Sequence, residues 1–131
     1  MKKFFYLSLL ILGLASVKSS VAQVSVNINI GSQPLWGPVG YDYVRYYYMP
    51  EIDVYYNVNS RNYTYWRGNK WVTKSKLPGN YKNFDVYRTY KVVINESNPW
   101  RRHPHYRHTY ARHAHNHSQV ILRYRRKGGQ G

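Results

Sequence analysis

In YTYWRGNKWVT, residues 63–73, two aromatic runs flank the four residues Arg67-Gly68-Asn69-Lys70. Gly68 and Asn69 suit the positive φ angles of a two-residue hairpin turn. That loop fixes the register, because a slip of one residue would move every side chain to the opposite face. The pattern predicts a β-hairpin with Trp66 opposite Trp71, followed by the pairs Arg67 with Lys70, Tyr65 with Val72 and Thr64 with Thr73.

Short runs of β-branched and aromatic residues continue on both sides of this hairpin, and none shows a sustained helical period. Residues 77–80 and the pair Asn98-Pro99 are typical of turns. Alternation predicts that one strand face carries Ile52, Val54, Tyr56 and Val58, and that a last strand carries Tyr90, Val92 and Ile94 on one face. We expect residues 41–96 to form a mainly β domain, a small antiparallel meander sheet.

Aromatic side chains must supply most of the core of so small a domain, because it buries only about 60% of its unfolded surface. Consecutive tyrosines at 46–48 and 55–56 place rings on both faces of their strands. We therefore expect a tyrosine-rich surface on one face or edge of the sheet.

Residues 1–22 read as a signal peptide. Lys2 and Lys3 precede an apolar stretch, and the small residues Ser20 and Ala22 mark a cleavage site before Gln23. The stretch is too interrupted for a membrane anchor, so we expect a signal helix, export to the periplasm or the exterior, and no transmembrane segment after cleavage. In residues 23–40 the alternation from Val24 to Ile30 predicts a strand, and the Gly- and Pro-rich part after it predicts a linker.

Charge divides the remaining 109 residues, which hold 17 basic and five acidic side chains, a net charge of +12. Residues 97–131 contain eight of the basic side chains, all six histidines and no acid. We expect these residues to form a basic His/Arg-rich tail that is mostly disordered.

Several stretches together resemble one group of proteins: residues 46–56 (YYYMPEIDVYY), 68–72 (GNKWV), Leu77-Pro78 and 90–95 (YKVVIN). The chain is similar to small, exported, tyrosine-rich uncharacterised proteins of Bacteroidota-type bacteria, which pair a signal peptide with an aromatic body and a His/Arg-rich tail. The resemblance covers most of the chain after residue 22. It implies an envelope location and a shared fold, and it transfers no catalytic or binding residues.

The basic tail favours an anionic partner such as an envelope polymer or surface. A specific nucleic-acid function is disfavoured by export and by the lack of a recognisable nucleic-acid module. The candidate anion-binding residues are Arg101, Arg102, Arg107, Arg112, Arg123, Arg125, Arg126 and Lys127. We therefore expect a non-enzymatic envelope protein that needs no cofactor.

Two other binding functions stay open. Paired histidines can ligate divalent metals, and the candidates are His103, His105, His113, His115 and His117, although the tail offers no carboxylate to complete a site. Exposed aromatic rings can stack on sugars, and the candidates are Trp66, Trp71 and Tyr55. Catalysis is disfavoured because the chain has no cysteine and only five acids, which read as solubilising charges.

Overall fold

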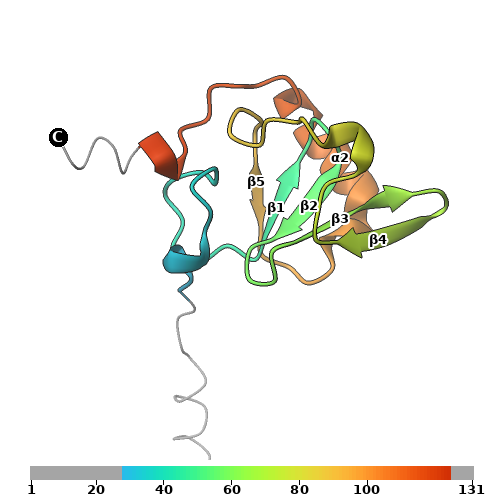
Figure 1. The fold of residues 1–131 in the computed structure, drawn as a ribbon, viewed down its shortest axis with the longest axis horizontal. Coiled ribbons are helices and arrows are strands. Elements are labelled where there is room, and N and C mark those ends of the chain that lie inside the picture. Colours follow the sequence, from blue (N-terminus) through green and yellow to red (C-terminus); the bar gives the residue numbers. More distant parts are fainter. Residues whose placement is uncertain (1–27, 125–131) are drawn as a thin grey trace, which may run out of the picture.

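The computed structural model describes residues 28–124, which fold around one five-stranded antiparallel sheet (Figure 1). The strands are β1 (Tyr46–Met49), β2 (Val54–Asn57), β3 (Asn62–Arg67), β4 (Lys70–Lys74) and β5 (Val92–Ile94). Their order is β4-β3-β2-β1-β5, so the first four form a meander and β5 returns to pair with β1. The mainly β, antiparallel prediction is confirmed, and the signal helix lies outside the described residues.

The hairpin has the predicted register. Trp66 pairs with Trp71 and Arg67 with Lys70, and Gly68 adopts the left-handed conformation with φ of 69°. The hydroxyls of Thr64 and Thr73 hydrogen-bond across the strands at 2.8 Å.

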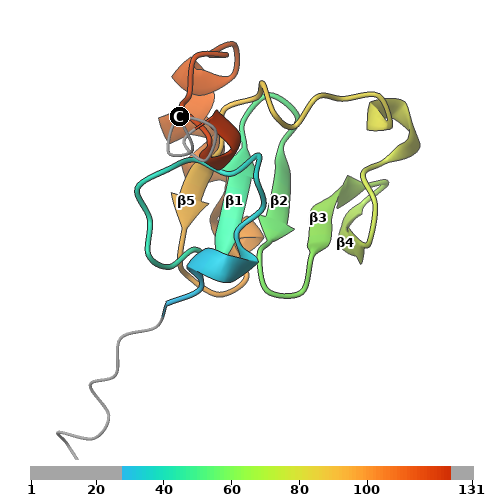
Figure 2. The same ribbon diagram turned by 60° about the vertical axis from the view of Figure 1, so that its left-hand side comes forward.

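Both faces of the sheet are aromatic, as the runs of tyrosine predict. Tyr47, Val54 and Tyr56 pack on the first face, whereas Tyr46, Tyr48 and Tyr55 pack on the second. Each face has a cover: residues from the N-terminal segment and from the loop after β4 lie on the first face, and helix α2 lies on the second (Figures 1 and 2). The prediction of a tyrosine-rich surface on the sheet is wrong, because these six side chains keep at most 7% of their surface exposed.

The C-terminal segment supplies the cover of the second face. It forms the 3-10 helix η3 (Pro99–Arg102), the α-helix α2 (His103–Tyr110) and the 3-10 helix η4 (Ala111–His113). Tyr106 is buried against β1 and β5, with Trp100 and Tyr110 beside it. The prediction of a mostly disordered tail is wrong for residues 97–124, because aromatic side chains there bury the second face; residues 125–131 lie outside the described part.

The N-terminal segment covers the first face. Residues 28 and 29 have no regular structure and Ile30 begins the 3-10 helix η1 (Ile30–Ser32), so the predicted strand from Val24 is wrong at its described end and otherwise lies outside the described residues. The expected linker packs against the sheet: the centroid of the Trp36 ring lies 5.5 Å from that of Tyr47 and 4.7 Å from that of Tyr56. A bridge between Pro38 and Ile121 joins this segment to the C-terminal part.

Candidate functional site

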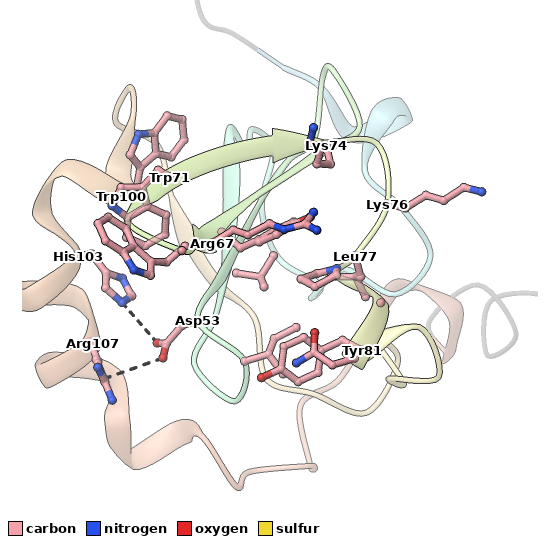
Figure 3. Close-up of a pocket in the computed structure, with 18 of the residues that line it drawn as sticks. Asp53, Arg67, Trp71, Lys74, Lys76, Leu77, Tyr81, Trp100, His103 and Arg107 are labelled. Atoms are coloured by element: carbon pink, nitrogen blue, oxygen red, sulfur yellow. Dashed lines mark ion pairs between the residues drawn. The ribbon is translucent and has the colours of Figure 1, made fainter.

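A groove opens where the hairpin leaves the sheet. Strand β2 begins at Val54, directly after a turn in which Asp53 adopts φ of 54°. The register between β2 and β3 therefore ends at Thr64, and β3 continues to Arg67 with β4 as its partner. The volume beneath this projecting hairpin is about 1160 Å³. Its walls are η3 and α2 on one side and the loop of residues 75–81 on the other (Figure 3).

Basic side chains from separate segments line this groove. Arg67 and Lys74 come from the hairpin, Lys76 from the loop after it, and Arg101 and Arg107 from the C-terminal helices. In Figure 3 the Arg67 side chain crosses the middle of the groove, while Lys76 points outward from its rim. Such a cluster creates a positive potential that attracts anions.

Asp53 is the only carboxylate among the described residues that line the groove. The Tyr48 hydroxyl donates a hydrogen bond of 2.6 Å to its Oδ1 atom. His103 Nε2 lies 3.6 Å from the same oxygen, and Arg107 Nε lies 3.9 Å from Oδ2 (Figure 3). Because Arg107 is the charged neighbour of Asp53, these two charges offset each other, and the positive potential of the groove comes from the other four basic side chains.

His103 joins the groove to the core. Its Nδ1 atom lies 2.8 Å from the Tyr55 hydroxyl, and its ring centroid lies 4.9 Å from that of Trp71. Burial is the strongest influence on both groups: it lowers the pKa of His103 and raises the pKa of Tyr55. At neutral pH the imidazole is therefore uncharged, with Nδ1 accepting from Tyr55 and the Nε2 proton directed at Asp53.

Tryptophans form the aromatic side of the groove. Trp66 and Trp71 meet edge to face with ring centroids 5.5 Å apart, and Trp71 and Trp100 both line the groove and both contact the Tyr55 ring. Trp66 is 55% exposed and Trp71 is half-buried. Tyr55 has no exposed surface on which a ligand could stack. Of the three candidates for glycan stacking, Trp66 and Trp71 therefore remain.

The predicted anion-binding residues fall in different places. Arg101, Arg107 and Arg112 are exposed, and the first two line the groove. Arg102 is exposed too, but it pairs with Glu96 at 3.2 Å. Arg123 lies over the Tyr87 ring, away from the groove lining. Arg125, Arg126 and Lys127 lie outside the described residues.

The candidate metal ligands make separate contacts with different parts of the protein. His103 bonds to Tyr55, His113 stacks on Tyr90 at 4.2 Å, and His117 contacts Glu51 at 2.8 Å. His105 and His115 are exposed. Within residues 28–124, no three His, Asp or Glu side chains converge on a common metal position.

Sequence patterns did not predict a binding role for the hairpin and loop cations of the groove, for Asp53 or for Trp100. The length of the hairpin was a usable signal, since a hairpin longer than its neighbour strand must project beyond it. The position of Trp100 and Asp53 depends on how the C-terminal segment docks, which local pattern alone does not reveal.

Comparisons of the chain with protein-family models, with curated proteins and with solved structures found no match. In the part of the chain that the structure describes, no helix has the length and apolar character needed to cross a membrane.

Proposed function

We propose that this chain is a non-enzymatic, exported envelope protein that binds anionic envelope polymers, and that the groove under the β3–β4 hairpin is its binding site. The observation that carries the proposal is the charge of the groove: among the described residues, five basic side chains from three segments line it, against one carboxylate, which pairs with Arg107. An acidic polymer could place several negative groups among these cations.

The exposed cations of the C-terminal helices extend this surface beyond the groove. Arg101 and Arg107 line the groove and are also exposed on the C-terminal helices, and exposed Arg112 lies further along the same segment. This arrangement revises the expectation of a freely moving polycation, because these side chains are held in place by a helix that is packed against the sheet. Fixed cations bind with a smaller loss of conformational entropy than those of a disordered segment.

The charge of the groove suits anionic polysaccharides better than neutral sugars. The exposed Trp66 favours glycan stacking as a second function. Indole rings provide stacking surfaces, and the neighbouring Arg67 and Lys74 provide charge. The acid-base groups that a hydrolase would need, Asp53 and His103, are bonded to buried tyrosines, which supports binding over catalysis.

The proposal is tested by titrating the protein with polygalacturonate, an acidic polysaccharide, and with neutral dextran. We expect polygalacturonate to bind with an affinity that falls as salt rises, and dextran to bind more weakly and without salt dependence. Equal affinity for both polymers at every salt concentration would contradict the proposal.

Matched variants locate the site. The groove variant changes Arg67, Lys74 and Lys76 to Gln, and the control variant makes the same change at Arg61, Lys82 and Arg88, which are exposed outside the groove. With about 0.5 kcal/mol for each lost charge contact, the groove variant should bind about tenfold more weakly. An equal loss in the control variant would assign binding to overall charge.

A further inference from the structure

Two buried tyrosines beneath the groove each have a hydrogen-bond acceptor that can take a proton. Tyr48 and Tyr55 are fully buried, and their rings stack with centroids 4.8 Å apart. The Tyr48 hydroxyl donates to Asp53 at 2.6 Å, and the Tyr55 hydroxyl lies 2.8 Å from His103 Nδ1. Both distances are within the range for hydrogen bonds in proteins.

The protonation states of Tyr55 and His103 suit a proton transfer that accompanies the loss of an electron from Tyr55. Burial keeps the Tyr55 phenol protonated and His103 uncharged at neutral pH. A phenol becomes a strong acid when it loses an electron, and a neutral imidazole at hydrogen-bond distance can accept its proton. The imidazolium formed would then face the Asp53 carboxylate, whose Oδ1 lies 3.6 Å from Nε2.

Aromatic rings connect Tyr55 to solvent. The centroid of Tyr55 lies 5.9 Å from that of Trp71, which lies 5.5 Å from that of Trp66. Trp66 is 55% exposed, whereas Tyr55 has no exposed surface. A dissolved oxidant can therefore contact Trp66 but not Tyr55.

We propose that Trp66, Trp71 and Tyr55 form a path for one-electron oxidation, in which Tyr55 is the final electron donor and His103 accepts its proton. The oxidant belongs to the class of oxygen-centred radicals, and it gains one electron from the Trp66 indole. An electron moves from Tyr55 through Trp71 to refill Trp66, while the Tyr55 proton moves to His103 Nδ1. The products are a reduced oxidant, a neutral tyrosyl radical and an imidazolium. A small-molecule one-electron reductant reverses the change at Tyr55 as the proton returns. This proposal does not rest on the proposed polymer binding, but both involve Trp66, which lines the groove.

Flash photolysis with a ruthenium tris-bipyridine complex and an electron acceptor tests the path, because the ruthenium(III) formed is a one-electron oxidant. Transient absorption should show an indole radical that converts to a tyrosyl radical. We expect Tyr55→Phe to abolish this conversion and Tyr124→Phe, at an exposed tyrosine, to retain it. Conversion at the wild-type yield in Tyr55→Phe would overturn the proposal.

Two further measurements separate the electron path from the proton acceptor. Trp66→Phe changes an exposed side chain, so the fold should survive, and we expect a loss of tyrosyl yield. His103→Gln should remove the slowing that deuterium oxide causes in the wild-type conversion. An unchanged tyrosyl yield in the first variant, or an unchanged isotope effect in the second, would refute the corresponding part of the path.

Discussion

Lys91 offers a quantitative test of the packing on the first face of the sheet. It is 1% exposed, its Nζ donates to the Val86 carbonyl oxygen at 2.6 Å, and it lies 6.0 Å from the centre of the Trp36 ring. Burial lowers its pKa from 10.5 to about 8, although Asp85 acts in the opposite direction. The N-terminal segment that contains Trp36 contributes to this burial.

The pKa difference converts into stability. Between pH 8 and 10.5 the unfolded chain binds more protons at this lysine than the folded protein does, so the free energy of unfolding rises with pH. Below about pH 8 the buried ammonium costs the fold about 3 kcal/mol. From pH 7 to pH 9 the wild-type protein should recover about 1.3 kcal/mol of this cost. Above about pH 10 the trend reverses, because burial raises the pKa of tyrosines such as Tyr47 and Tyr48 while unfolded tyrosines ionise.

Lys91→Met removes the titrating group. At pH 7 the substitution has two opposing effects on the free energy of unfolding. Losing the buried charge raises it, and leaving the Val86 carbonyl oxygen without its donor lowers it by about 1–3 kcal/mol. The informative quantity is therefore the change of this free energy with pH. Urea denaturation followed by tryptophan fluorescence at pH 7 and pH 9 measures it, with Lys82→Met at an exposed lysine as the control. The variant should lack the rise of about 1.3 kcal/mol that the wild type and the control show. A rise of equal size in Lys91→Met would refute the assignment.

Three further stability predictions can be checked by urea denaturation. Trp66→Ala at the exposed indole should cost about 1 kcal/mol, the value of an edge-to-face pair, and half-buried Trp71→Ala should cost about 2 kcal/mol; equal losses would contradict their different burial. Deleting residues 97–131 should abolish the cooperative transition, because it uncovers the second face of the sheet; a stable truncated body would show that this cover is dispensable. Gly37→Ala should cost about 1–3 kcal/mol, since a Cβ there would lie 2.3 Å from the Tyr47 hydroxyl oxygen, and wild-type stability would contradict that close contact.

Alternation and turn chemistry were sufficient to predict the hairpin and the faces of the strands. The Trp66 and Trp71 register follows from two turn residues, and Val92 and Ile94 share the expected face. These features depend on local backbone geometry and on the two-residue period of a strand.

The helix of the C-terminal segment could not be predicted in the same way, because histidine was counted as a polar, charge-bearing residue. Trp100, His103, Tyr106, Tyr110 and His113 recur at helical spacing, and each of them makes an aromatic contact with the sheet or with another of the five. When uncharged histidine is treated as an aromatic packing residue, the segment acquires an amphipathic face. The groove was missed for the same reason, since this helix forms one of its walls.

Binding of an anionic polymer in the groove can be located by mapping amide chemical shifts by nuclear magnetic resonance during titration with an acidic oligogalacturonide. We expect the largest changes at groove residues such as Arg67, Trp71, Lys74 and Arg107, and we expect high salt to suppress them. Changes of similar size at the exposed cations Arg61 and Arg88, or no change along the β3–β4 hairpin, would contradict binding in the groove.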